Sequence, residues 1–422
     1  MLALGLAGKL TSFTVDLDAL EKTADYVVET IRTNYPDLKI PFHARWRHFT
    51  FGGRDLWGKL AAGIGDRDER SRAGFDLAII SVLLDAGAGM AWRFREPATG
   101  ETSRSEGLAL ASLRMFESGI FSLHPGNRYR ADASKLKAIT PKDVARAFQV
   151  SEANPLVGVE GRAALLNALG AAVEALPGAR PGGLFDLLKK QSLATVKSTL
   201  EVPGATDVRG GKGRQVRRER QNSLDAFMQG QGAVISTSPT LGATAILEAV
   251  LTYLGPIWPS RISLGGVPLG DTWKHPLIGG TGETAGLVPF HKLSQWLSYS
   301  LIEPMQWAGV TVTGIDGLTG LPEYRNGGLF TDMGVITLID PAMADADNTV
   351  DSSLVVEWRA LTVALLDRIA PMIRARLGLA EADFPLARVL EGGTWAAGRR
   401  IAKSLRDDGG PPIRVVSDGT VF

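Results

Sequence analysis

The sequence contains no cysteine, and this absence excludes several kinds of chemistry. Without thiols there is no disulfide, no thiolate zinc site and no cysteine nucleophile. Only five histidines are present, and none forms an HExxH motif or a comparable pair of metal ligands. We therefore expect no structural metal and no cofactor.

The chain also lacks a large net charge and any long apolar run. Its formal net charge is +1 over 422 residues, which argues against a nucleic acid polymer as the main partner and favours a small-molecule ligand. The apolar opening MLALGLAGKL is short and has no clean signal-peptide cleavage pattern, and no other run could span a bilayer. We expect a cytoplasmic protein without membrane contact.

What the sequence does contain is helical periodicity. Hydrophobic residues make up 45% of the chain, enough for a large core. They recur at helical spacing in 16–35, 75–85, 289–304 and 357–377, whereas few segments alternate with period two. This pattern predicts a mainly α fold with a few short strands.

A change in composition at 201–222, EVPGATDVRGGKGRQVRRERQN, divides the chain. It predicts an N-terminal helical domain at 1–200, a basic Gly-rich loop or linker at 201–222 and a C-terminal domain at 223–422. The basic run at 209–220 is typical of a solvated linker, and the functional alternative is a lid over a phosphorylated ligand.

The stretch 287–334 is the predicted centre of the chemistry. A helix predicted from Pro289 to Pro304 places His291 and Lys292 in its first turn. The Gly- and Pro-rich segment that follows predicts a loop without a long regular element. That loop carries Glu323, Tyr324, Arg325 and Asn326. A carboxylate, a guanidinium, a ring and an amide in a constrained loop suit a small-molecule site.

Two further features offer binding residues. The segment IPFHARWRHFTFGGRDLW interleaves His43, Arg45 and Arg47 with aromatic residues, so it could bind a phosphate or a sugar ring. The alternative is an exposed surface held by cation–π contacts. Tryptophans gather in the second half of the chain, among them Trp258, where they favour ring-lined pockets.

Several long segments resemble the uracil-catabolism protein family of fungi and bacteria. They are VPFHKLSQWLSYSLIEP, GIDGLTGLPEYRNGGLFTDMGVI, SLVVEWRALTVALLDRIAP, LEGGTWAAGR and the terminal SDGTVF. Together with PFHARWRHF and RSEGLALAS they cover nearly the full chain. The resemblance implies a role in the pyrimidine degradation route in which uracil is converted to its nucleotide and the ring is then opened.

A more distant resemblance is to the queuosine-salvage nucleoside glycosidases, which are similar to helix-hairpin-helix DNA glycosylases. Their pattern is an upstream Lys, Asp-Tyr-Arg, Gly-Val-Leu and a downstream Glu-x-Arg. Here Lys292, Glu323-Tyr324-Arg325, Gly334-Val335-Ile336 and Glu357-Trp358-Arg359 follow in the same order, with Glu in place of Asp at 323. The resemblance implies a two-lobed helical architecture like that of the DNA glycosylases.

The two resemblances together imply an N-glycosidic bond hydrolase that releases urea from ribosylurea or its 5′-phosphate. Glu323 would stabilise the positive charge at the anomeric carbon or activate water, assisted by Lys292. The implied substrate-binding residues are His291, Tyr324, Arg325, Asn326, Glu357, Arg359, Trp258, His43, Arg45 and Arg47.

Simpler interpretations exist for both catalytic candidates. Glu323 could merely cap the following turn, Lys292 could merely pair with Glu303, and either Asp332 or Asp340 could supply the carboxylate instead. For the whole protein, the alternatives are a nucleotide-binding or scaffold protein that contacts other enzymes of the pathway, and a phosphoribosyltransferase. VITLID has the apolar run of the latter but lacks its second acid and its phosphate loop.

Overall fold

The computed structural model describes residues 1–85, 87–89, 91–104, 106–200, 238–258 and 261–416. The predicted linker at 201–222, with its basic run at 209–220, lies outside these residues. The helices are α1 (Leu2–Leu6), α2 (Asp18–Asn34), α3 (Leu56–Ala61), α4 (Arg67–Leu83), α5 (Gly107–Glu117), α6 (Ala133–Lys137), α7 (Pro141–Ala147), α8 (Val159–Ala172), α9 (Gly183–Leu200), α11 (Ala243–Leu254), α12 (Lys292–Trp307), α13 (Tyr324–Asp332), α14 (Ser353–Leu377), α15 (Leu386–Arg388) and α16 (Trp395–Leu405). The predicted mainly α fold is confirmed.

The strands are two or three residues long and pair two by two. They are β1 (Phe13–Val15) with β12 (Ile336–Leu338), β2 (Thr50–Phe51) with β3 (Arg54–Asp55), β4 (Phe94–Arg95) with β5 (Thr102–Ser103), β6 (Thr240–Gly242) with β11 (Thr311–Thr313), β7 (Ser263–Leu264) with β8 (Val267–Pro268), β9 (Thr272–Lys274) with β10 (Leu287–Pro289), and β13 (Asn348–Thr349) with β14 (Val415–Val416). Among the described residues, these short pairs connect neighbouring segments and do not build a larger sheet.

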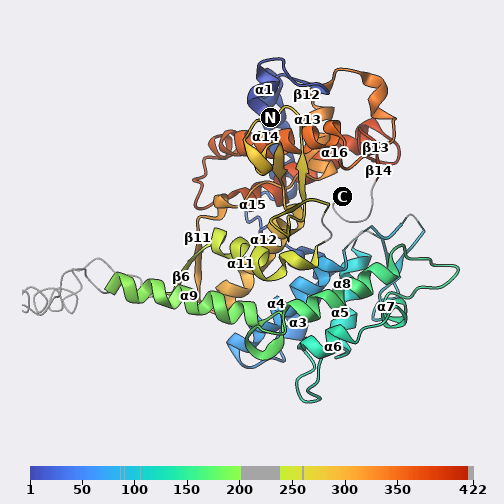
Figure 1. Ribbon diagram of the computed structural model, residues 1–422, viewed down its shortest axis with the longest axis vertical. Coiled ribbons are helices and arrows are strands. Elements are labelled where there is room, and N and C mark those ends of the chain that lie inside the picture. The colour runs from blue at the N-terminus through green and yellow to red at the C-terminus, as the bar shows by residue number, and fades with distance from the viewer. Residues whose placement is uncertain (86, 90, 105, 201–237, 259–260, 417–422) are drawn as a thin grey trace, which may run out of the picture.

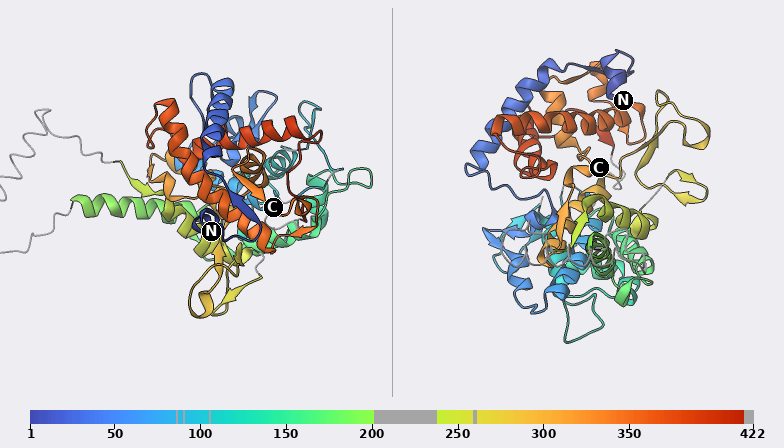
Figure 2. Two further views of the ribbon diagram at one scale, coloured as in Figure 1. Left: turned by 90° about the horizontal axis from the view of Figure 1, so that it is seen from above. Right: turned by 90° about the vertical axis from the view of Figure 1, so that its left-hand side faces the viewer.

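The helices form two groups with α11 and α12 between them (Figure 1). One group holds α3 to α8, and the other holds α1, α13, α14 and α16. The second group also includes α2, which packs against α14, while β1 pairs with β12. The start of the predicted N-terminal domain therefore contacts the C-terminal half, as the blue and red ribbons of Figure 2 show. The division into 1–200 and 223–422 stays a prediction, as does the likeness to DNA glycosylases.

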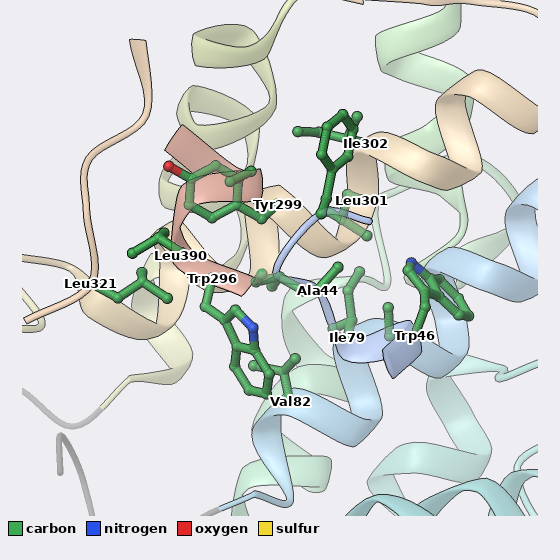
Figure 3. Close-up of a cluster of buried hydrophobic side chains, with 14 of the residues drawn as sticks. Ala44, Trp46, Ile79, Val82, Trp296, Tyr299, Leu301, Ile302, Leu321 and Leu390 are labelled. Atoms are coloured by element: carbon green, nitrogen blue, oxygen red, sulfur yellow. The ribbon is translucent and has the colours of Figure 1, made fainter. Parts of the chain in front are cut away.

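Helix α12 is buried along most of its length and packs against both α4 and α11. Figure 3 shows Trp296, Tyr299, Leu301 and Ile302 of this helix among buried side chains of other elements. Its predicted limits were wrong. Pro289 belongs to β10, and Pro304 lies inside the last turn of the helix and not beyond its end. His291, with a φ of 50°, starts the helix from a left-handed conformation.

The segment from Asp316 to Gly328 was predicted to be a loop without a long regular element, yet α13 begins within it at Tyr324. Gly327 and Gly328 are typical turn formers in sequence, yet in the structure they lie in a helix and allow its neighbours to pack closely against it. A Cβ at Gly327 would lie 2.9 Å from the Trp358 indole, and one at Gly328 would lie 3.1 Å from Pro412. The glycines therefore let α13 approach α14 and the chain near 412.

Candidate active site

Asp271 organises the N-terminal end of α12. Its carboxylate accepts a hydrogen bond from the Lys292 backbone N–H at 2.9 Å and so satisfies a donor that the helix leaves without a partner. The same carboxylate accepts hydrogen bonds from both terminal nitrogens of Arg359, at 2.8 and 2.7 Å. Burial alone would raise the pKa of Asp271, but the Arg359 guanidinium and the hydrogen bonds lower it to about 2. Asp271 is thus a fixed anion.

The Lys292 side chain lies among these charges. Burial and the neighbouring Arg359 guanidinium lower its pKa to about 8, while Asp271, Glu323 and Asp85 act in the opposite direction. The Glu323 carboxylate is therefore within electrostatic reach of Lys292, although the two residues lie on different helices. We call Lys292, Asp271, Arg359 and Glu323 the lysine cluster.

Glu323 is the N-cap of α13. Its two carboxylate oxygens accept hydrogen bonds from the backbone N–H groups of Asn326, at 2.6 Å, and Arg325, at 3.0 Å. The capping role is real, and it does not use the full hydrogen-bonding capacity of a carboxylate. The partial positive charge of a helix N-terminus attracts carboxylate side chains, so the start of α13 suits Glu323.

The two alternative carboxylates are placed differently. Asp332 forms an ion pair with Arg406, with oxygens 2.9 and 2.6 Å from the two terminal guanidinium nitrogens. Asp340 is exposed and caps the short turn Pro341–Ala344 through Ala342 N–H. Glu303, the alternative partner of Lys292, is paired with Arg47 at 2.7 Å. Among these candidate carboxylates, Glu323 is the one that acts electrostatically on Lys292.

A second group of side chains surrounds Trp395 at the start of α16. The Arg325 guanidinium lies 4.6 Å from the Trp395 ring and 4.8 Å from the Tyr324 ring. Arg399 stands over the same indole at 5.3 Å. We call Arg325, Arg399, Trp395 and Tyr324 the arginine cluster.

Gly398 sets the geometry of the arginine cluster. A Cβ at this position would lie 2.2 Å from the Arg325 carbonyl oxygen, so only glycine lets α16 approach the first turn of α13 this closely. The π-helical turn η7 (Val389–Thr394) precedes α16, and its Gly392 and Gly393 pack directly on Ile40 and Val27. Tight packing thus fixes the ring on which both guanidinium groups lie.

The predicted basic segment is largely engaged within the protein. Arg45 is buried, with Asp85 at 2.9 Å and Ser81 at 2.7 Å. The His43 ring lies 2.6 Å from a Glu391 oxygen. Because Arg47 is held by Glu303, each of these three predicted substrate ligands has an acidic partner. The prediction of an exposed surface for this segment was wrong, since His43, Arg45 and Trp46 are buried.

Glu357 is turned away from the lysine cluster. Its oxygens accept hydrogen bonds from Thr11 N–H and O–H and from Ser12 N–H, and His275 lies 3.3 Å away. It therefore fastens the N-terminal segment to α14. Its substrate-binding role stays a prediction without a contact that favours it, whereas Arg359, two residues later, belongs to the lysine cluster.

Three other predicted residues lie near the helix starts. The Asn326 side chain is buried, and its amide donates to the Leu321 carbonyl at 3.0 Å. A Cβ on Gly270 would lie within about 4 Å of both His291 and Trp258, so these two side chains border Asp271. Burial lowers the pKa of His291, which keeps its imidazole neutral at pH 7.

Within the described residues, no group of three or more acidic or histidine side chains could hold a metal ion. No helix there combines the length and apolar character needed to cross a membrane.

The family described as "Protein of unknown function (DUF1688)" matches residues 1–208 and 212–422. The chain belongs to this family. Protein urg3 of Schizosaccharomyces pombe is 38% identical over 98% of this chain and 92% of its own length. Uracil catabolism protein 4 of Lachancea kluyveri is 36% identical over 98% of this chain and 93% of its own length. The two stretches that match the family contain every residue of the lysine and arginine clusters.

The sequence alone did not predict a functional role for Asp271, Trp395 or Arg399. Asp271 follows Gly270 in a segment so rich in glycine and proline that a single acid carries no signal. Trp395 and Arg399 both stand in the recognised LEGGTWAAGR motif, so the motif marked the region but not their role.

Proposed function

We propose that this protein hydrolyses an N-glycosidic bond in uracil catabolism and releases urea from ribosylurea or its 5′-phosphate. The observation that carries the proposal is the lysine cluster. It combines a lysine whose pKa is lowered to about 8 with a carboxylate held at a helix N-terminus. Strongly perturbed groups in such a charge cluster are typical of acid–base sites.

The names of the relatives support the pathway, since one of them is a uracil catabolism protein. In a uracil nucleotide, the ribose is bonded to a ring nitrogen that is also part of a urea unit. Breaking both bonds that join this unit to the three-carbon part of the ring of a uracil nucleotide leaves urea attached to the sugar. The bond that remains between urea and the sugar is an N-glycosidic bond, and a hydrolase can break it.

Glu323 is assigned to the sugar side of the reaction. As the C–N bond breaks, positive charge builds on the anomeric carbon, and a fixed carboxylate stabilises that charge. Two backbone N–H groups hold the carboxylate in place, so little reorganisation is needed. Water then adds its hydroxyl to the anomeric carbon.

Lys292 is assigned to the leaving group. With a pKa of about 8 it is mostly protonated at pH 7 and yet more acidic than an ordinary lysine. It can therefore donate a proton to the departing urea nitrogen, and the proton of the attacking water restores the balance. Tyr324, Asn326, His291 and Trp258 stay the predicted contacts of the sugar and the urea.

The test is urea release, measured by mass spectrometry, from ribosylurea 5′-phosphate, with uridine monophosphate as the control substrate. We expect turnover with water alone, and a loss of about 10²- to 10⁴-fold in kcat for Glu323→Gln. Asp66→Asn is the matched control, because Asp66 caps α4 through Glu69 N–H in the same way. This control is expected to keep full activity.

Other outcomes point to other functions. Full activity of Glu323→Gln would remove the carboxylate role from that residue. Binding without urea release would favour the nucleotide-binding or scaffold alternative, and a requirement for an activated sugar phosphate would favour the phosphoribosyltransferase.

A further inference from the structure

The arginine cluster contains more positive charge than the protein itself compensates. Arg325 and Arg399 both lie on the Trp395 ring, and among the described residues neither guanidinium has a carboxylate within ion-pair distance. Both side chains are half-buried, so they are shielded yet reachable. Two cations held close together by one ring repel each other unless an anion lies between them.

Three other arginines of this region are compensated by carboxylates of the protein itself. Arg45 is paired with Asp85, Arg47 with Glu303 and Arg359 with Asp271. The aromatic rings orient Arg325 and Arg399 without occupying their N–H groups. A stacked guanidinium therefore keeps its donors for a ligand.

Buried donors without partners extend the site along the adjacent rings. His43 lies 5.8 Å from Trp395 and 6.4 Å from Trp296, and His48 stands edge-on to Trp296 at 5.7 Å. Trp296 Nε1, His48 Nδ1 and Arg45 Nη2 are all buried and have no hydrogen-bond partner among the described residues. Buried polar groups in folded proteins are nearly always satisfied by protein, water or ligand, so these atoms offer hydrogen bonds to a bound molecule.

We propose that the arginine cluster binds the 5′-phosphate of the substrate, so that the protein acts on ribosylurea 5′-phosphate in preference to the free riboside. This inference rests on the proposed hydrolysis and names its substrate. Guanidinium groups form paired hydrogen bonds with phosphate oxygens, and a phosphate monoester supplies the negative charge that the cluster lacks.

The placement of the two clusters fits a ribosyl phosphate. Glu323 and Arg325 belong to the same first turn of α13, with Glu323 in the lysine cluster and Arg325 in the arginine cluster. In a ribose 5-phosphate unit, the anomeric carbon and the phosphate lie at opposite ends of the sugar. The sugar can then bridge the turn, with its reacting carbon at Glu323 and its phosphate at Arg325.

Adjacent arginines on α16 give a matched test. Arg399 lies on Trp395, whereas Arg400 is exposed and paired with Glu29. We expect Arg399→Met to lower kcat/KM for ribosylurea 5′-phosphate by about 10- to 100-fold, the value of a charge-assisted contact, and to leave the free riboside nearly unaffected. Arg400→Met should change neither. Equal losses for both substrates in Arg399→Met would overturn the assignment.

A binding measurement separates this inference from the proposed function. Calorimetry of the full chain with ribose 5-phosphate, inorganic phosphate and ribose needs no turnover. Tight binding of ribose 5-phosphate that weakens in Arg399→Met supports the subsite even if no substrate is hydrolysed. Hydrolysis of both substrates at equal rates, without any effect of Arg399→Met, overturns the subsite while the hydrolase stands. Inorganic phosphate binding as tightly as ribose 5-phosphate would overturn the link to the sugar.

Discussion

The lysine and arginine clusters meet at the first turn of α13, and they compensate their cations in opposite ways. In the lysine cluster the cation Arg359 is buried and held by both oxygens of Asp271. In the arginine cluster, rings take the place of carboxylates around Arg325 and Arg399. A paired, buried cation sets geometry and electrostatics, whereas a stacked, unpaired cation remains available to a ligand. The comparison separates residues that shape the site from residues that bind.

The largest expected effect comes from breaking the pair in the lysine cluster. Asp271→Asn leaves the buried Arg359 guanidinium without its counter-charge and should reduce the free energy of unfolding by about 3 to 5 kcal/mol. Chemical denaturation at 25 °C measures the loss. The matched control is Asp347→Asn, because its partner Arg414 is largely exposed and such pairs contribute less than about 1 kcal/mol. Equal losses in the two variants would contradict the comparison.

The second effect concerns the lowered pKa of Lys292. The unfolded chain binds this proton up to a pH near 10.5, whereas the folded chain loses it near 8, so the folded state gains stability as pH rises through that window. Relative to Lys292→Met, the wild type should therefore gain about 2 to 3 kcal/mol between pH 7 and 10.

Denaturation of both proteins across this pH range tests the prediction, because groups common to both cancel in the difference. A constant difference would show that Lys292 titrates normally. In activity assays, the same group should give the wild type a change in rate near pH 8, provided that Lys292 acts as the proposed acid.

These clusters also show how far sequence reasoning reaches. Periodicity located α12 and α14, because a buried stripe leaves a regular apolar pattern. It missed α13, where Gly327 and Gly328 have low helix propensity and where packing against Trp358 and Pro412 outweighs that preference. Glycine permits a turn and also permits close packing, and only the neighbours in space decide between the two.

The site residues divide in the same way. Lys292, Glu323 and Arg325 were selected from their residue types in one stretch of sequence, and the resemblance then gave Lys292 and Glu323 their predicted roles. Asp271 pairs with Arg359, 88 positions further along the chain, and Arg399 lies near Arg325 because α16 packs on α13, so both arrangements depend on the tertiary fold. The predicted roles of Arg45 and Arg47 were assigned from charge alone, which does not reveal that Asp85 and Glu303 already neutralise them.

A smaller effect should follow from Gly398→Ala, which disturbs the arginine cluster through its backbone. The added Cβ would meet the Arg325 carbonyl oxygen, so α16 must move from α13, at a cost of about 1 to 3 kcal/mol. Gly161→Ala is the matched control. This exposed glycine of α8 has nothing within 4 Å of an added Cβ, and alanine should stabilise the helix by about 0.5 kcal/mol. Thermal denaturation of both variants should therefore give shifts of opposite sign.

The smallest expected effect is the most direct test of the comparison. If Arg399 has no acidic partner, Arg399→Met removes repulsion with Arg325 and keeps an apolar stem on Trp395, so the free energy of unfolding should change by less than about 0.5 kcal/mol. Ribose 5-phosphate should stabilise the wild type against thermal unfolding and should stabilise Arg399→Met less, because at a given ligand concentration the stabilisation rises with the logarithm of the affinity for the folded state. A loss of several kcal/mol without ligand would show that Arg399 supports the fold, and the distinction between the two clusters would then fail.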